Sequence, residues 1–245
     1  MKEQRFKLLF VVNDLGFLVS HRLPIVVAAR KAGYVVHVAY GSVGEVSARD
    51  GLFHGLEMHY VPIERGGMNP LIDLRTLVLL WRLFRRVSPD LVHLVTIKPV
   101  LYGGIAARLA HVPAVVSAMA GLGFVFTEQR DFKALLVRRA LRTVFACALA
   151  HPCQTLIFQN PADRCRILKM MRLPLLKTSL IRGSGVDLAA CPVLPEPKGP
   201  LIVVMASRLL KNKGVLEFVA AARLLRERGV SARFWLIGDI DLANP

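Results

Sequence analysis

Two basic side chains, Arg208 and Lys213, lie in a short segment between a predicted strand and a predicted helix. The apolar run at residues 201–205 predicts a buried strand, and residues 215–228 predict a helix. A helix N-terminus carries unpaired N–H groups and a partial positive charge, so fixed cations beside it can hold a phosphate-bearing ligand. The sequence therefore predicts an anion site in this loop.

A second group of polar residues lies within residues 13–24, where the first predicted strand gives way to the first predicted helix. Gly16 would allow a tight turn and Ser20 would cap the helix. His21 and Arg22 would add hydrogen-bond donors beside the positive end of that helix. This set indicates a site for an anion or for sugar hydroxyl groups, and the alternative is an ordinary capped helix with a solvated His-Arg pair.

Lys98 follows a third predicted strand, residues 91–95. In a parallel sheet it would point into the crevice at the carboxyl ends of the strands, where ligands of such folds bind. Pro99 would fix the turn, and Gly103 and Gly104 would allow a close approach of two backbones. The alternative interpretation is a lysine on a surface loop.

Other glycine pairs give weaker signals. Gly121 and Gly123 form a lone G-x-G after a predicted strand, and close packing of the chain would explain them equally well. Gly183 and Gly185 do not complete a dinucleotide fingerprint, because the third glycine would fall on Leu188. There is also no P-loop motif, so the sequence argues against nicotinamide, flavin and P-loop enzymes.

Asp239 and Asp241 have the spacing of paired carboxylates that hold a divalent ion on a diphosphate. Acidic residues are also common in turns, and Arg208 and Lys213 already offer the positive charge that an ion would supply. We therefore predict that no metal is required.

The histidines and cysteines favour structural roles. His93 lies within a predicted strand and His151 begins a Pro-containing turn, and both are predicted to have their hydrogen bonds satisfied. The cysteines show no C-x-x-C spacing and nothing before them has the pattern of a secretory signal, so they are predicted to be reduced, cytosolic and buried. They are Cys147, Cys153, Cys165 and Cys191.

The charge balance implies an anionic partner. The chain has 33 Lys and Arg against 17 Asp and Glu, a formal net charge of +16. No nucleic-acid-reading module is apparent, so a specific nucleic-acid partner is not predicted. The basic residues lie on apolar segments at 74–87 and 134–150, neither of which has the roughly 18 uninterrupted apolar residues of a spanning helix. Both segments are predicted to lie on an anionic membrane surface.

Strands and helices alternate along the chain, which predicts an α/β fold with a parallel sheet covered by helices on both faces. Four prolines between residues 189 and 200 indicate a linker. We therefore predict an N-terminal domain at residues 1–188, a linker at 189–199 and the beginning of a second domain at 200–245.

An ordered set of motifs resembles the family 4 glycosyltransferases of the GT-B fold, and within them the bacterial enzymes that extend polyprenyl-diphosphate-linked sugars for surface polysaccharides. The likeness covers essentially the whole chain and rests on Asn13-Asp14, residues 20–24, 96–99, 102–104, 121–123, 159–160 and 181–187, Ser207-Arg208 and Lys213-Gly214.

The resemblance implies two Rossmann-like domains, the first for a lipid-linked saccharide acceptor and the second for a nucleotide sugar, usually a UDP-sugar. It further implies transfer with retention, without metal, at the cytoplasmic face of the inner membrane. Arg208 and Lys213 would hold the donor diphosphate, and Gly16 would lie near the donor phosphates. The acceptor side would include Asn13, Ser20, His21, Lys98, Gly121 and Gly123, and the hinge Gly185 and Asp187.

Two departures from the family pattern bear on activity. The glutamate-bearing signature that contacts the donor would come after Pro245, and no histidine occupies the family's acceptor-side position near residues 119–121. We therefore expect little or no transfer by this 245-residue polypeptide. The alternative prediction is a non-catalytic remnant that binds membranes or polyanions.

Overall fold

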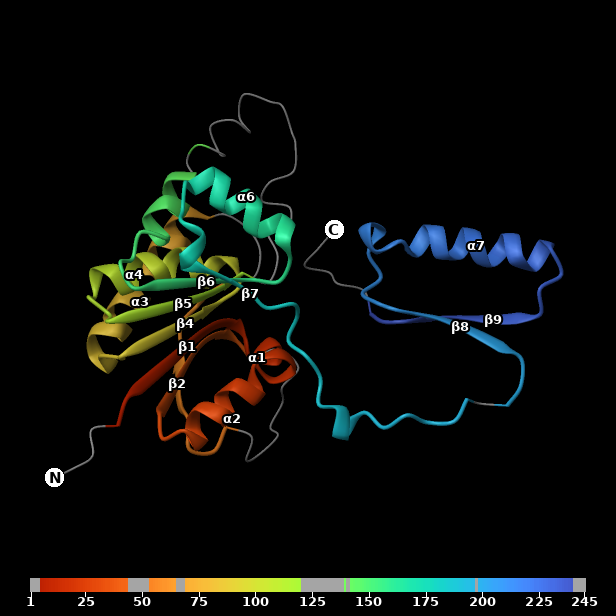
Figure 1. The fold of residues 1–245 in the computed structure, drawn as a ribbon, viewed down its shortest axis with the longest axis horizontal. Coiled ribbons are helices and arrows are strands. Elements are labelled where there is room, and N and C mark those ends of the chain that lie inside the picture. The colour runs from red at the N-terminus through yellow and green to blue at the C-terminus, as the bar shows by residue number, and fades with distance from the viewer. Residues whose placement is uncertain are drawn as a thin grey trace. The chain divides into compact units, whose positions relative to one another are not determined.

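The computed structural model of the protein describes residues 5–43, 53–64, 69–119, 139, 142–196 and 198–239. The chain divides into two compact units, Met1–Gly185 and Val186–Pro245 (Figure 1). The predicted linker at residues 189–199 falls within the second unit. Its role as a linker stays a prediction.

A seven-stranded sheet forms the centre of the first unit, with every neighbouring pair of strands parallel. Its order is β3-β2-β1-β4-β5-β6-β7. The strands are β1 (Lys7–Asp14), β2 (Val35–Ser42), β3 (Glu57–Tyr60), β4 (Leu91–Val95), β5 (Ala114–Met119), β6 (Gln154–Phe158) and β7 (Thr178–Leu180). The predicted α/β fold with a parallel sheet is confirmed.

Helices cover both faces of this sheet (Figure 1). The helical elements of the first unit include α1 (Leu15–His21), α2 (Leu23–Lys31), α3 (Pro70–Val87), the π-helix η1 (Pro99–Gly103), α4 (Gly104–Leu109), α6 (Pro161–Met171) and the 3-10 turn η3 (Leu175–Lys177). Residues 142–148 are also helical. Within the described residues, no helix combines the length and apolarity needed to cross a bilayer.

The alternation of side chains along β1 explains the two apolar layers. Leu9 and Val11 pack with α3 and α4 on one face, whereas Phe10 and Val12 pack with α1 and α2 on the other. All four side chains are fully buried. A strand that is apolar on both faces is typical of a parallel sheet between two helical layers.

Gly104 brings α4 against the helical segment 142–148. A Cβ at this position would collide with the backbone carbonyl of Ala148, and one at Gly103 would meet the side chain of Leu94. The predicted close approach of two backbones is confirmed for Gly104, whereas Gly103 faces a side chain.

The second unit contains β8 (Leu201–Ala206), α7 (Val215–Glu227) and β9 (Ala232–Ile237), with β8 and β9 parallel. Two 3-10 turns precede α7, η4 (Leu188–Ala190) and η5 (Lys211–Lys213). Phe218 of α7 and Phe234 of β9 pack edge to face at 6.1 Å between ring centroids. The strand and the helix predicted at residues 201–205 and 215–228 correspond to β8 and α7.

The prediction of buried cysteines is wrong. All four thiols are free and exposed. Cys147, for example, lies on the outer side of the helical segment 142–148, whereas Phe145 and Ala148 of the same segment face the core. A small apolar side chain gives no sequence signal of which face it occupies.

Candidate functional site

The carboxyl ends of β1 and β4 lie side by side at the point where the strand order reverses. The chain runs outward from β1 through β2 to β3 and then returns to the other side of β1 as β4. Such a switch point opens a crevice beyond the strand ends, the usual ligand site of an open α/β sheet. Here the Thr96 hydroxyl donates a hydrogen bond of 3.3 Å to Asn13 Oδ1.

The start of the first helix differs from the prediction. Asp14, not Ser20, caps α1, and its Oδ1 accepts a 2.9 Å hydrogen bond from the Phe17 N–H. Gly16 lies in the first turn of α1 and forms no tight turn. Ser20 lies inside the helix, where its hydroxyl donates to the Gly16 carbonyl at 2.7 Å. Because the Asp14 carboxylate at the end of β1 can accept hydrogen bonds from the first free N–H groups of a helix, α1 begins directly after the strand.

His21 and Arg22 are separated by their surroundings. His21 is exposed, and its ring stacks on Phe17 at 4.3 Å between centroids. Arg22 lies at the break between α1 and α2 and is only 6% exposed. The alternative of a solvated His-Arg pair is therefore wrong for Arg22.

Arg22 is a buried cation whose hydrogen bonds, within the described residues, go to neutral groups. Its Nη1 donates to the His21 carbonyl at 3.3 Å and to Ser184 Oγ at 3.1 Å. Within the described residues its buried Nε has no hydrogen-bond partner. Burial lowers the pKa of Arg22 because the charged form loses its hydration. An anion beside this guanidinium would offset that cost.

His93 of β4 faces the same region. It is 8% exposed, and its Nε2 has no hydrogen-bond partner among the described residues. Burial, and to a lesser degree the charge of Arg22, lowers the pKa of His93 to about 4. The ring is therefore neutral at pH 7. The prediction of a satisfied strand histidine is wrong for His93, because the cavity beside it supplies no partner.

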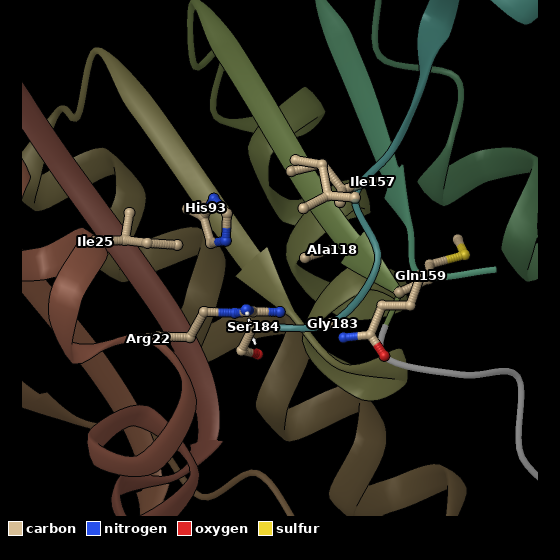
Figure 2. A pocket seen from close by; sticks show the side chains of 10 residues that line it. Arg22, Ile25, His93, Ala118, Ile157, Gln159, Gly183 and Ser184 are labelled. Carbon is tan, nitrogen blue, oxygen red and sulfur yellow. Dashed lines mark hydrogen bonds between the residues drawn. The ribbon is translucent and has the colours of Figure 1, made fainter. Parts of the chain in front are cut away.

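Arg22 and His93 line one cavity of about 90 Å³ at the carboxyl-terminal halves of β4, β5 and β6 (Figure 2). Ser184 and Gln159 are the other polar residues of its lining, with Gln159 across the cavity from Arg22 (Figure 2). The remaining lining is Ile25, Ala118, Met119, Ile157, Ile181 and Gly183. A cation with neutral donors among apolar side chains suits an anion attached to an apolar group.

Lys98 is paired within the protein. Its Nζ lies 3.1 Å from Asp73 Oδ1, with both side chains largely buried. Asp73 also acts on Tyr102, whose pKa is raised by burial and by its hydrogen bond to that carboxylate. Lys98 is absent from the lining of the Arg22 cavity. Its role in acceptor binding stays a prediction.

The predicted donor loop has the expected local structure. Arg208 and Lys213 are exposed between β8 and α7, and Gly214 caps α7 with φ of +85°. Gly16 belongs to the first unit and these two cations to the second. Their joint role on donor phosphates stays a prediction.

The remaining predicted positions divide three ways. Gly185 ends the first unit with φ of +73°, and Asp187 Oδ1 accepts a 3.0 Å hydrogen bond from the Ala189 N–H. His151 is satisfied as predicted, with its ring nitrogens 3.1 Å from the Cys153 carbonyl and 2.9 Å from the Val112 carbonyl. Three positions lie outside the described residues: Gly121, Gly123 and Asp241.

The family of the chain follows from comparison with known proteins. Residues 7–151 match the family described as glycosyl transferase 4-like, which is more than half of the chain. The chain belongs to this family. The matched segment holds β1, β4, Arg22 and His93, whereas Gln159 and Ser184 on the cavity lining follow it in the chain.

Two curated glycosyltransferases are similar to this member of the family. The UDP-Gal:alpha-D-GlcNAc-diphosphoundecaprenol alpha-1,3-galactosyltransferase of Escherichia coli is 32% identical over 140 residues, 57% of this chain and 34% of that protein. The N,N'-diacetylbacillosaminyl-diphospho-undecaprenol alpha-1,3-N-acetylgalactosaminyltransferase of Campylobacter jejuni is 27% identical over 134 residues, 55% of this chain and 35% of that protein. The matches thus span about a third of each relative.

The fold of this family member also resembles a solved structure. A glycosyltransferase from Rickettsia africae ESF-5 superposes with a TM-score of 0.63 at 16% identity, covering 96% of this chain and 61% of that one. This likeness in fold covers residues of both units, whereas the family match covers residues 7–151.

The sequence does not predict three polar members of the site. His93 is expected to be a satisfied strand histidine, and Gln159 and Ser184 appear only within the motifs of the family resemblance. For Gln159 and Ser184 the available signal is their position after parallel strands, because such positions share one edge of the sheet.

Proposed function

We propose that the protein is a retaining glycosyltransferase that moves a sugar from a UDP-sugar to a polyprenyl-diphosphate-linked saccharide of surface polysaccharide synthesis. Family membership supports glycosyl transfer. The names of the two curated relatives support a diphosphoundecaprenol acceptor, and one of them names a UDP donor. The observation that carries the proposal is the cavity of Arg22 and His93 at the switch point of the sheet.

The first unit binds the acceptor in this proposal. Its crevice offers a buried cation, neutral hydrogen-bond donors and an apolar wall, a combination suited to a diphosphate carried on a lipid. Asn13, Ser20, His21 and Lys98 surround the same strand ends or the first helix. They are candidates for contacts to the saccharide.

The second unit binds the donor. Arg208 and Lys213 stand at the entrance to α7, where they would add charge to the free N–H groups of the helix. Fixed cations beside a departing nucleoside diphosphate stabilise the charge that develops as the glycosidic bond exchanges. This role requires no metal ion.

One face of α3 supports attachment to an anionic membrane surface. Leu71, Leu74 and Trp81 are 79%, 58% and 39% exposed, and Arg75, Arg82 and Arg85 are exposed among them. Spacings of three, four and seven residues place these side chains on one stripe. Each cation near anionic lipid contributes about 1 kcal/mol. The protein would then work at the cytoplasmic face of the inner membrane.

The proposal is tested by incubating a longer polypeptide, which carries the family's glutamate-bearing signature after Pro245, with a panel of UDP-sugars and an undecaprenyl-diphosphate-linked saccharide, and measuring the release of UDP. Release that needs both substrates supports it, and NMR of the product reports retention at the anomeric carbon. No release with any donor in a broad panel contradicts it. Vesicle binding without measurable affinity for any nucleotide sugar would instead favour the non-catalytic remnant.

A further inference from the structure

We infer that the cavity between Arg22, His93 and Ser184 is an oxyanion subsite that takes a phosphoryl group, with its apolar wall against the ester carbons of that group. The inference rests on the proposed function only for the substrate that supplies the phosphate. The site itself rests on the charge of Arg22, on the hydrogen-bond donors around it and on the cavity that they line.

The charge of Arg22 requires an anion. Among the described residues its hydrogen bonds go to a carbonyl and a hydroxyl, both neutral. A buried cation without a carboxylate partner is costly, and an anionic ligand beside it would complete the pair. A phosphoryl oxygen would form the charge-assisted hydrogen bond for which guanidinium geometry is suited.

Unused donors surround the same space. Arg22 Nε is buried without a partner, and so is Nε2 of the neutral His93, which donates in one of its two tautomers. Ser184 Oγ accepts from Arg22, so its own hydroxyl hydrogen remains to be donated. Figure 2 shows Gln159 on the opposite side of the cavity. A tetrahedral oxyanion offers acceptors in several directions and matches this arrangement.

The lining of the cavity favours one class of phosphate. At about 90 Å³, the cavity has room for a phosphoryl group. Ile25, Ile157 and Ile181 would contact the carbon atoms of the group esterified to the phosphate. An alkyl ester meets this wall better than a ribose does, because hydroxyl groups would lose their hydration there.

Titration of the 245-residue chain at about 0.15 M salt tests the inference by calorimetry. The probes are inorganic phosphate, dimethylallyl phosphate and UDP. Salt at this concentration screens general attraction to the +16 chain. We expect dimethylallyl phosphate to bind more tightly than inorganic phosphate, and Arg22→Gln to weaken it at least about tenfold, as for a lost charged hydrogen bond.

Two further variants separate a ligand site from a structural contact. Arg30→Gln, on the exposed side of the same helix pair, should leave affinity unchanged. Ser184→Ala breaks the bond to Arg22 but keeps the charge, so it should weaken binding only about threefold. Thermal unfolding followed by circular dichroism checks that each variant is folded.

Three results would overturn the inference. One is binding of dimethylallyl phosphate that is equal in the native chain and in a folded Arg22→Gln variant. Another is Arg22-dependent binding of UDP alone. The third is an equal loss for Ser184→Ala and Arg22→Gln, because that would mean that the charge of Arg22 adds nothing to binding beyond its contact with Ser184. Each result is independent of glycosyl transfer, so failure of the subsite and failure of the proposed function are distinguishable.

Discussion

Arg22 Nη1 donates a 3.1 Å hydrogen bond to Ser184 Oγ, a contact between residues 162 positions apart in the chain. It joins the break between α1 and α2 to the loop that follows β7, just before the boundary between the two units. The same guanidinium lines the cavity at the carboxyl ends of the strands. Arg22 therefore both holds the last loop of the first unit in place and lines the candidate ligand site of that unit.

His93 should make the stability of the protein depend on pH. Its pKa is lowered to about 4 in the folded state, below the ordinary value of 6.5, so the unfolded chain binds the proton first as pH falls. The free energy of unfolding should therefore decrease between pH 6.5 and 4, by up to about 3 kcal/mol from this group.

Urea unfolding at a series of pH values measures that dependence. His93→Gln should flatten it across this window, whereas His54→Gln, at an exposed histidine, should not. An unchanged slope in a folded His93→Gln variant would contradict the assigned environment.

Gly104 should be intolerant of a side chain. Gly104→Ala places a Cβ against the Ala148 carbonyl, a backbone group that cannot swing aside, and should destabilise the protein by about 2 kcal/mol or more. Gly103→Ala meets the flexible end of Leu94 and should cost less. Denaturant unfolding compares the two, and equal stability losses would argue against the packing of α4 described above.

Charge reversal in the second unit should remove donor binding. Arg208→Glu and Lys213→Glu should each weaken UDP-sugar affinity at least about tenfold, because an attractive charge becomes repulsive beside the diphosphate. Calorimetry with UDP-sugars measures the loss. Arg228→Glu, exposed at the far end of α7, is the control for the change in net charge. If all three variants behave alike, the two cations do not form a donor site.

The α3 stripe should govern membrane attachment. Replacing Leu74, Trp81 and Arg82 together by Gln should reduce co-sedimentation with vesicles of anionic lipid several-fold, since both apolar contact and charge are lost. Arg108→Gln, exposed on α4, should have little effect. Retention of full binding by the triple variant would place the membrane surface elsewhere.

The sequence predicted the architecture well because the signals were local. The uninterrupted apolar run of β1, the amphipathic pattern of α3 and the β-α-β order of the second unit each depend on periodicity within a single element. The beginnings of helices were predicted less accurately. Asp14 and Ser20 are both suitable capping residues, and which of them caps the first helix depends on where β1 ends.

The candidate site was predicted in outline but not in detail. Sequence indicated the strand ends and Arg22, yet it could not tell that Arg22 is buried while the adjacent His21 is exposed. Nor could it show that Lys98 is paired with Asp73, 25 residues away. Such facts depend on contacts between distant segments, which periodicity does not encode.

The central claim is that the acceptor phosphate binds the first unit and the donor diphosphate binds the second. Steady-state kinetics of UDP release tests it most directly, measured on the longer polypeptide that carries the glutamate-bearing signature after Pro245, with each substrate varied in turn. The account predicts that Arg22→Gln raises the KM for the lipid-linked acceptor at least about tenfold and leaves the donor KM unchanged. A raised donor KM with an unchanged acceptor KM would contradict it.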